Sequence, residues 1–206
     1  MSKFQVIPAF PSIIAASKID SDVNEIWDNI PNIKFSETTG DDATGSVSIK
    51  MRLLNEYPKV KNLILKEFYE FKDSVLNLST TDFNITTSWM TLTPPNGFCQ
   101  MHNHRNSVYS GVIYQTSNSD ADSGNLILTA PVNNTILINT PTEYNAFNSD
   151  VVTIEPDENL CIFFPSYLHH KISKHTGLEN RYSIAVNFFP CGELTHGDSS
   201  IKIEVE

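Results

Sequence analysis

The chain has 206 residues, 40% of them hydrophobic and 18% charged, a composition that supplies a buried core and excludes a disordered protein. Its formal net charge of −10 argues against binding to nucleic acids or anionic membranes through net charge. No apolar run approaches the roughly 20 residues that span a bilayer, and the first ten residues do not have the pattern of a secretory signal.

Two helices are predicted in the first 80 residues. The first follows Asp22, because Asp22 and Glu25 have the spacing of a capping box and apolar residues then recur at helical spacing until Pro31. Residues 36–45, rich in Thr, Gly and Asp, are predicted to form a loop. The second helix begins near Pro58, which suits a first turn, and its apolar face comprises Val60, Leu63, Ile64, Phe68, Phe71 and Val75. The rest of its surface is predicted to be solvated and carries Lys59, Lys61, Lys66, Glu70 and Lys72.

From about residue 82 the pattern changes to the period of two that is typical of strands. The first such run alternates through Phe83, Ile85, Thr87, Trp89 and Thr91. Later runs rich in Val, Ile, Tyr and Phe are separated by turn residues and cover 108–115, 125–129, 135–138, 151–154, 160–164, 182–189 and 201–205. Many short strands predict a sandwich or barrel. Strands and helices do not alternate, which argues against a doubly wound parallel sheet.

All six histidines lie after residue 100. His102 and His104 fall in an apparent strand, where residues two apart face the same side, so both imidazoles can converge on a metal ion. The pair alone fits a polar turn equally well. His169 and His170 directly follow a predicted strand, and one of them can face inward.

Arg181 and Ser183 share one face of the strand predicted near residues 182–189. An arginine on the inward face of a barrel is costly unless it meets an anion. The alternative is an arginine at the rim of the sheet, paired with one of the many carboxylates.

Together these segments resemble the iron(II)- and 2-oxoglutarate-dependent oxygenases, particularly a branch found in bacterial and phage proteins. The matching segments are Ser88-Trp89, His102-x-His104, residues 110–114 and 123–126, Phe164-Pro165-Ser166 followed by His170, and Arg181-x-Ser183 followed by Asn187. The resemblance covers about residues 83–190.

The resemblance implies a mainly β fold, a double-stranded β-helix (jelly-roll) barrel with N-terminal α-helices packed on it. We therefore expect a single domain, residues 1–206, with a helical part at 1–80 and a jelly-roll core at 81–206. The implied activity is that of an enzyme, a hydroxylase that uses iron(II), dioxygen and 2-oxoglutarate as cosubstrate. Oxidative decarboxylation of 2-oxoglutarate would be coupled to oxidation of a small-molecule or peptide substrate.

Carried onto this sequence, the resemblance implies that His102 and His170 are iron ligands. Arg181 would grip the far carboxylate of 2-oxoglutarate, and Ser183 and Tyr114 would add hydroxyl hydrogen bonds to it. By the same pattern His169 is a neighbour of the site, and two further histidines are expected on the surface, namely His175 and His196.

The chain departs from the family pattern at His104, because most of the superfamily has Asp or Glu there. Either His104 itself ligates iron, giving a three-histidine site, or it turns away and water or another acid takes the place. The shared face of His102 and His104 favours ligation. Asp120 and Asp122 lie in a following loop and are poor substitutes.

Two other interpretations stay open. A cupin-like metalloenzyme that does not use 2-oxoglutarate explains the missing carboxylate but leaves Arg181 without a function. A non-enzymatic jelly-roll protein treats the histidines as incidental. Four aromatic residues could line a pocket, although core packing is the commoner role for Trp89, Phe98, Phe163 and Phe188.

Two expectations concern the setting of the protein. The three widely spaced cysteines predict free thiols and a cytoplasmic location, the host cytoplasm if a phage encodes the chain. The helical part could either pack against the outer face of the barrel or support a homodimer.

Overall fold

The computed structural model describes Gln5, Ile7 and residues 10–19, 23–38, 43–115, 124–131 and 141–205. The helices are α1 (Asn24–Asp28) and α2 (Pro58–Ser74), with short 3-10 turns η2 (Ile30–Asn32), η3 (Leu53–Glu56) and η4 (Gly197–Ser199). The strands are β1 (Ala15–Lys18), β2 (Phe35–Thr38), β3 (Ala43–Ser48), β4 (Asp82–Thr93), β5 (Phe98–His102), β6 (Tyr109–Tyr114), β7 (Leu126–Thr129), β8 (Val151–Ile154), β9 (Leu160–Pro165), β10 (His170–Ile172), β11 (Arg181–Leu194) and β12 (Ile201–Ile203).

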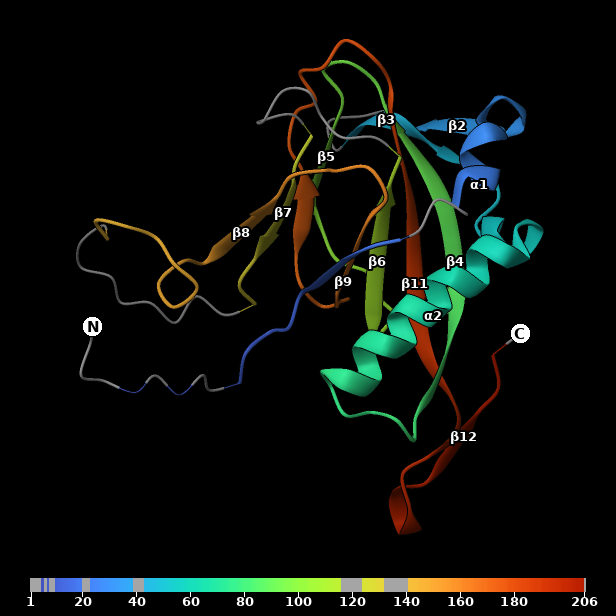
Figure 1. Cartoon of the computed structure of the whole chain (residues 1–206), viewed down its shortest axis with the longest axis vertical. Coiled ribbons are helices and arrows are strands. Elements are labelled where there is room, and N and C mark those ends of the chain that lie inside the picture. Colours follow the sequence, from blue (N-terminus) through green and yellow to red (C-terminus); the bar gives the residue numbers. More distant parts are fainter. Residues whose placement is uncertain are drawn as a thin grey trace.

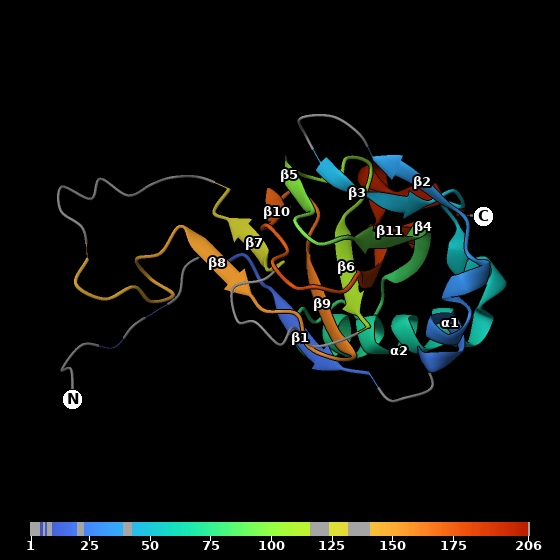
Figure 2. The same cartoon turned by 90° about the horizontal axis from the view of Figure 1, so that it is seen from above.

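These strands form one antiparallel sheet that folds back on itself (Figures 1 and 2). The larger layer has the order β1-β9-β6-β11-β4, and the smaller layer has the order β5-β10-β7-β8. Strand β3 joins the two layers, since its Ser46 and Val47 pair with β4 and its Thr44 pairs with β5. The architecture confirms the predicted mainly β, jelly-roll fold.

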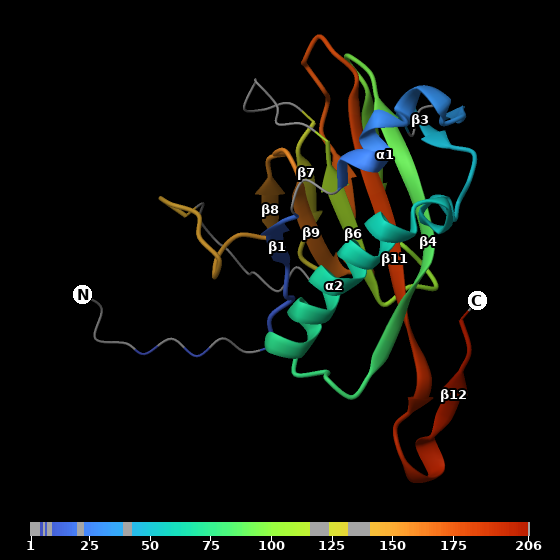
Figure 3. The same cartoon turned by 45° about the vertical axis from the view of Figure 1, so that its right-hand side comes forward.

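Helix α2 lies across the outer face of the larger layer (Figure 3). Its Phe68 ring stacks on Phe188 of β11 with a centroid separation of 4.0 Å, and it meets Phe83 and Phe163 edge-on at 5.3 and 5.4 Å. The same cluster contains residues of α1, η3 and β4. The helical part therefore packs on the barrel, which is one of the two arrangements left open by the sequence.

Phe68 is the residue on which this packing depends most. The substitution Phe68→Ala removes a fully buried ring and leaves a cavity between α2 and the sheet, so we expect a loss of about 3–5 kcal/mol in the free energy of unfolding. Urea unfolding monitored by circular dichroism measures it. Lys66→Ala, an exposed position on the same helix, serves as the control and should change stability by less than about 0.5 kcal/mol. Equal effects of the two variants would contradict this view of the core.

Most of the strands that were predicted from the period-two pattern are present in the structure. The runs at 108–115, 125–129, 151–154, 160–164, 182–189 and 201–205 correspond to β6, β7, β8, β9, β11 and β12. The run at 135–138 lies outside the described residues, as does Asp22 of the predicted capping box. The loop predicted at 36–45 is wrong where the structure describes it, because residues 36–38 belong to β2 and residues 43–45 to β3, and the two strands pair in antiparallel register. Residues 39–42 lie outside the described residues.

Two predictions about α2 are also corrected. Lys72 is buried rather than solvated, because its Nζ donates to the carbonyl of Leu78 and to Asp73 and lies over the Tyr69 ring. Val75 is 54% exposed, since α2 ends at Ser74 and the apolar stripe stops with it.

A bulge in β4 divides the alternation that predicted this strand. Asn187 of β11 pairs with Thr87, and Phe188 pairs with Ile85, so Thr86 is an extra residue. Phe83 and Ile85 therefore pack in the cluster under α2, together with Met90, whereas Trp89 and Thr91 face the space between the layers. None of the helices in the described ranges combines the length and apolar character needed to cross a bilayer.

Candidate functional site

The pairing of β5 with β10 brings two histidines together. His102 and His170 are direct partners in the register of these antiparallel strands, so their side chains lie on the same face. His104 follows two residues after the end of β5. The ring centroids are 4.3 Å apart for His102 and His170, 5.0 Å for His104 and His170, and 5.3 Å for His102 and His104. One ligand atom from each ring lies within 4.8 Å of the others.

Hydrogen bonds select which nitrogen of each ring is available. Nδ1 of His102 lies 2.8 Å from the carbonyl oxygen of Gln100, and Nδ1 of His170 lies 3.0 Å from that of Leu168. Nδ1 of His104 lies 2.6 Å from Oδ1 of Asn187. Since these oxygens can only accept, each Nδ1 carries the hydrogen and each neutral ring keeps a lone pair on Nε2.

The free lone pairs suit a transition-metal ion. Nε2 of His104 lies 3.4 Å from Nε2 of His102, and two lone pairs at this distance repel each other unless a cation or a donor lies between them. Three neutral imidazoles are a donor set that iron(II) accepts. The residues present therefore fit a divalent metal of this kind.

Burial keeps two of the rings neutral. The loss of hydration lowers the pKa of His170 to about 3, against a smaller opposing effect of its bond to Leu168. Burial also lowers the pKa of His104, and its hydrogen bond to Asn187 opposes that change. Neutral imidazole is the form that binds metals, so these two rings need not lose a proton before a metal binds at neutral pH.

The lowered pKa of His170 predicts how the metal-free protein responds to acid. The unfolded chain protonates this residue near pH 6.5, whereas the folded chain does so only at about pH 3. Between these values the unfolded state holds more protons, so stability falls as the pH drops below 6.5. We expect the free energy of unfolding of the wild type, measured in urea, to fall between pH 7.5 and pH 5. For His170→Gln the fall should be less steep than for the wild type, by up to about 1.4 kcal/mol per pH unit. Equal pH dependence of stability in the variant and the wild type would contradict the lowered pKa of His170.

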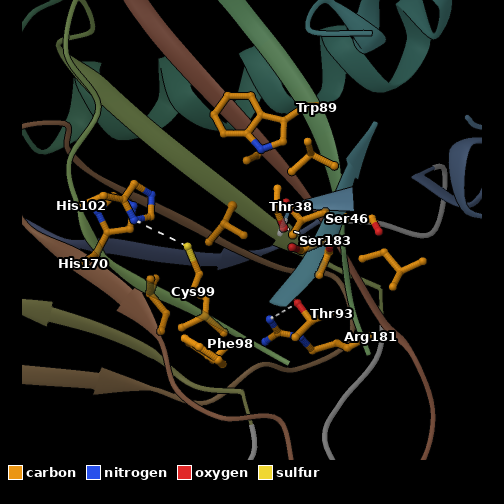
Figure 4. A pocket seen from close by; sticks show the side chains of 18 of the residues that line it. Thr38, Ser46, Trp89, Thr93, Phe98, Cys99, His102, His170, Arg181 and Ser183 are labelled. Carbon is orange, nitrogen blue, oxygen red and sulfur yellow. Dashed lines mark hydrogen bonds between the residues drawn. The ribbon is translucent and has the colours of Figure 1, made fainter. Parts of the chain in front are cut away.

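A cavity of about 210 Å³ separates the two layers beside the histidines. His102 and His170 lie at one end, Arg181 lies beside Thr93 at the other, and Cys99 lies between them (Figure 4). The wall includes hydroxyl and aromatic side chains, among them Thr38, Ser46, Trp89, Thr91 and Phe98.

The far end of the cavity contains a buried cation. Arg181 is 2% exposed, its Nη1 donates to the carbonyl of Gly124 and its Nη2 donates to Thr93 Oγ1 at 3.2 Å. Its Nε is buried and has no hydrogen-bond partner among the described residues, and neither has the buried hydroxyl of Tyr114. The described residues also include no carboxylate paired with Arg181. A buried guanidinium in this state is costly, which fits a site that an anion completes.

Tyr114 packs against Arg181 at the same end of the cavity. The guanidinium carbon of Arg181 lies 5.4 Å from the centre of the Tyr114 ring. Burial raises the pKa of Tyr114 to about 12, although the positive charge of Arg181 opposes that shift. The phenol is therefore protonated at neutral pH and able to donate. Tyr114 packs with the apolar residues between the layers and does not line the cavity itself, whereas Ser183 does.

The remaining predictions for histidine and aromatic residues have mixed outcomes. His169 and His196 are exposed, as expected. His175 is not a surface residue, because it is 4% exposed and its Nε2 bonds to the carbonyl of Glu179 within a turn. Among the aromatic residues considered for a pocket, two line the cavity, Trp89 and Phe98. The other two, Phe163 and Phe188, pack under α2 instead.

Some site residues carried no signal in the sequence. The hydroxyl residues of β2 and β3 reach the cavity because β3 crosses between the layers, whereas Thr93 continues the face of β4 that carries Trp89 and Thr91. The contact of Asn187 with His104 joins residues 83 positions apart in the chain. Asp120 and Asp122 lie outside the described residues.

Comparisons with known proteins agree with this arrangement. Residues 87–187 match the model of a family described as "Putative 2OG-Fe(II) oxygenase". A prolyl-4-hydroxylase from Pseudomonas putida is similar at 15% identity and a TM-score of 0.56, over 86% of this chain and 92% of that one. The epimerase SnoN from nogalamycin biosynthesis, in complex with Fe3+ and alpha ketoglutarate, reaches a TM-score of 0.65 at 10% identity, over 86% and 79% of the two chains.

HygX from Streptomyces hygroscopicus, a structure with nickel and 2-oxoglutarate bound, gives a TM-score of 0.59 at 9% identity. The match covers 86% of this chain and 82% of that one. No curated protein sequence matches the chain. At these identities the solved structures show only that this chain shares their fold, and the activity is indicated by the family match.

Proposed function

Because this chain belongs to the 2OG-Fe(II) oxygenases, enzymes that use iron(II), 2-oxoglutarate and dioxygen, we propose that it is a hydroxylase whose iron is held by His102, His104 and His170. The observation that carries the proposal is the orientation of the three rings. Every Nδ1 is occupied by an oxygen acceptor, and one ligand atom from each ring converges at one end of the cavity. The family match supports oxygenase activity, and we propose hydroxylation as the reaction.

At the opposite end, Arg181 binds the far carboxylate of 2-oxoglutarate. Its unpartnered Nε and its buried position support this role, because a carboxylate can satisfy a guanidinium with two parallel hydrogen bonds. Ser183 lines the same end and supplies a hydroxyl. Tyr114 does not line the cavity, but it is buried beside Arg181, and its phenol hydrogen has no acceptor among the described residues and can donate to an anion that meets the guanidinium.

When bound, iron and cosubstrate supply the oxidation: one oxygen atom of dioxygen enters the substrate C–H bond, and the other enters succinate as 2-oxoglutarate loses carbon dioxide. The residues of this chain hold and orient the reactants. The three histidines would hold the metal at one end of the cavity. Arg181 fixes the cosubstrate at the other end, and the space between the two layers accommodates it.

Two measurements test the function. Anaerobic addition of iron(II) and 2-oxoglutarate to the purified protein should produce a weak visible charge-transfer band. In air, succinate should form from 2-oxoglutarate, and formation should rise when a true substrate from a panel of small molecules and peptides is added. A correctly folded, iron-loaded protein without band or succinate would contradict the proposal.

A separate prediction concerns Tyr114. A hydrogen bond to a charged group contributes about 1.5–3 kcal/mol, so we expect Tyr114→Phe to raise the Kd of 2-oxoglutarate roughly 10-fold to 100-fold. Titration calorimetry under nitrogen measures it, and iron binding should stay unchanged. Tyr167→Phe, an exposed tyrosine, is the matched control. If Tyr114→Phe binds 2-oxoglutarate with wild-type affinity, the phenol does not contribute to binding the carboxylate.

The competing interpretations account less well for the family match or for Arg181. A non-enzymatic jelly-roll protein does not agree with the family match. A cupin-like enzyme without 2-oxoglutarate leaves the buried guanidinium unexplained. SnoN is an epimerase of similar fold, so epimerisation is the second candidate reaction for this site.

We also propose that residues 1–206 act as one domain in the cytoplasm. A shared cluster supports the single domain, because Leu54 and Phe68 of the helical part pack with Phe188 of the barrel. The three cysteines are free thiols, which supports a reducing compartment.

A further inference from the structure

Asn187 lies on the inward face of β11, in line with the residues of the cosubstrate end. Arg181, Ser183 and Ala185 line the cavity at every second position, and Asn187 continues this series toward the histidines. There its Oδ1 lies 2.6 Å from Nδ1 of His104. The same strand therefore serves both ends of the site.

Two further hydrogen bonds hold the amide of Asn187. Its Nδ2 donates to Thr87 Oγ1 at 2.9 Å, and its Oδ1 accepts from Ser110 Oγ at 2.8 Å. In this orientation the acceptor oxygen faces the imidazole of His104, and contacts with β4 and β6 hold the amide in place.

The bulge in β4 makes this arrangement possible. Because Thr86 is an extra residue, Thr87 turns to the inward face and lies opposite Asn187. Without the bulge, the alternation that places Ile85 under α2 would place Thr87 there as well. Thr86 Oγ1 in turn donates to the carbonyl of Asn187 at 3.3 Å.

Buried serines extend the support behind His104. Ser166 Oγ lies 2.8 Å from Ser110 Oγ and 2.8 Å from Ser107 Oγ. Ser166 also accepts the backbone N–H of His104 at its carbonyl, at 3.1 Å. Ser110 and Ser166 are fully buried, so this network offers His104 no competing water at these contacts.

His104 differs from the other two histidines in what holds its ring. His102 and His170 donate from Nδ1 to a backbone carbonyl two residues earlier in their own segments, so no side chain is needed. His104 donates to a side chain from a distant strand, Asn187 Oδ1 at 2.6 Å, and Ser110 Oγ lies 3.0 Å from the same Nδ1. Substituting Asn187 removes the nearer of these two contacts and leaves the contacts of His102 and His170 in place.

From these contacts, and on the basis of the proposed three-histidine centre, we infer that Asn187 is a positioning residue that makes His104 a metal ligand. Its carbonyl oxygen holds the hydrogen on Nδ1 and directs the lone pair of Nε2 to the metal. Thr87 and Ser110 hold Asn187 itself. This support allows a neutral imidazole to occupy the position where most of the superfamily has a carboxylate.

The experiment uses cobalt(II) as a spectroscopic probe in the full-length protein. In a cobalt-loaded protein, the N–H hydrogen of each ligating imidazole gives a strongly shifted proton NMR signal that disappears in D2O. We expect three such signals in the wild type, with the His104 signal identified by its loss in His104→Ala. In Asn187→Leu the His104 signal should vanish into exchange with water, while the other two remain.

Affinity and rescue complete the test. Losing a residue that supports a metal ligand costs roughly 10-fold to 100-fold in metal affinity, so cobalt should bind Asn187→Leu weaker by that factor. Asn187→Asp, which keeps an acceptor oxygen, should restore both signal and affinity. Asn84→Leu, which removes another amide from β4, is the control. If Asn187→Leu does not fold, Asn187→Ser replaces it with the same expected result.

The outcomes separate this inference from the proposed function. Three signals and unchanged affinity in Asn187→Leu would overturn the role of Asn187 and leave the three-histidine centre intact. Only two signals in the wild type would overturn the ligation by His104, and this inference with it. Failure of Asn187→Asp to restore the signal would also overturn the role assigned to the acceptor oxygen.

Discussion

The substitution Arg181→Leu is expected to raise the Kd of 2-oxoglutarate by at least about 100-fold. Two charge-assisted hydrogen bonds contribute about 1.5–3 kcal/mol each, and their joint loss corresponds to roughly 100-fold or more in affinity. Iron binding should not change, because the guanidinium lies at the end of the cavity opposite the histidines (Figure 4). Anaerobic titration of the iron-loaded protein with 2-oxoglutarate, monitored by calorimetry and by the visible band, measures the effect.

Two variants make the result specific to the guanidinium fork. Arg181→Lys keeps the charge but not the parallel pair of donors, so its affinity should fall between those of wild type and Arg181→Leu. Arg52→Leu removes an exposed arginine and should bind 2-oxoglutarate normally. If Arg181→Leu binds as tightly as wild type, the cosubstrate is anchored elsewhere. Turnover of a substrate by wild type without 2-oxoglutarate would favour the cupin-like alternative.

The second large effect is expected at the histidine that replaces the usual carboxylate. His104→Ala should weaken iron(II) binding by at least about 100-fold, since losing even a supporting residue of a ligand costs 10-fold to 100-fold. His104→Asp should keep iron in the site, because a carboxylate is also a suitable ligand. Anaerobic competition with a coloured chelator measures the affinities.

Two comparisons complete the test at this position. His170→Ala, a partner in the same cluster, should lose iron to at least the same degree. His169→Ala, the exposed neighbour, should bind iron like wild type. Equal affinity of His104→Ala and wild type would show that His104 is not a ligand, and the site would then contain two protein ligands.

Much of the site could be predicted from local patterns. The period of two placed Arg181 beside Ser183, because neighbouring positions of one face are a property of the strand alone. It also predicted His102 beside His104, although β5 ends at His102 and His104 lies two residues beyond it. The segment 160–164 with the following His170 similarly indicated a strand end. These patterns could not predict that His102 and His170 lie directly opposite each other, because that depends on the register of β5 against β10.

The errors came from places where pairing between distant strands overrides local sequence. Residues 36–45 have the composition of a loop, but β3 is held by hydrogen bonds to both β4 and β5. The bulge at Thr86 inverts the facing of the rest of β4, and the pattern of that segment contains no sign of it. Lys72 is typical of a solvated helix face, yet the carbonyl of Leu78 accepts its ammonium group.

The sequence by itself determined that this chain is a β-rich sandwich or barrel preceded by two helical segments, because hydrophobic periodicity is a local property that decides which face of each element is buried. It also determined the chemical kinds of the site residues, imidazoles and one guanidinium. Only the tertiary structure decided which nitrogen each imidazole offers and which side chain holds His104, since these depend on contacts such as that of Asn187 with His104, made across 83 residues of chain. Distances of that kind follow from strand register and from a bulge, which no short stretch of sequence specifies.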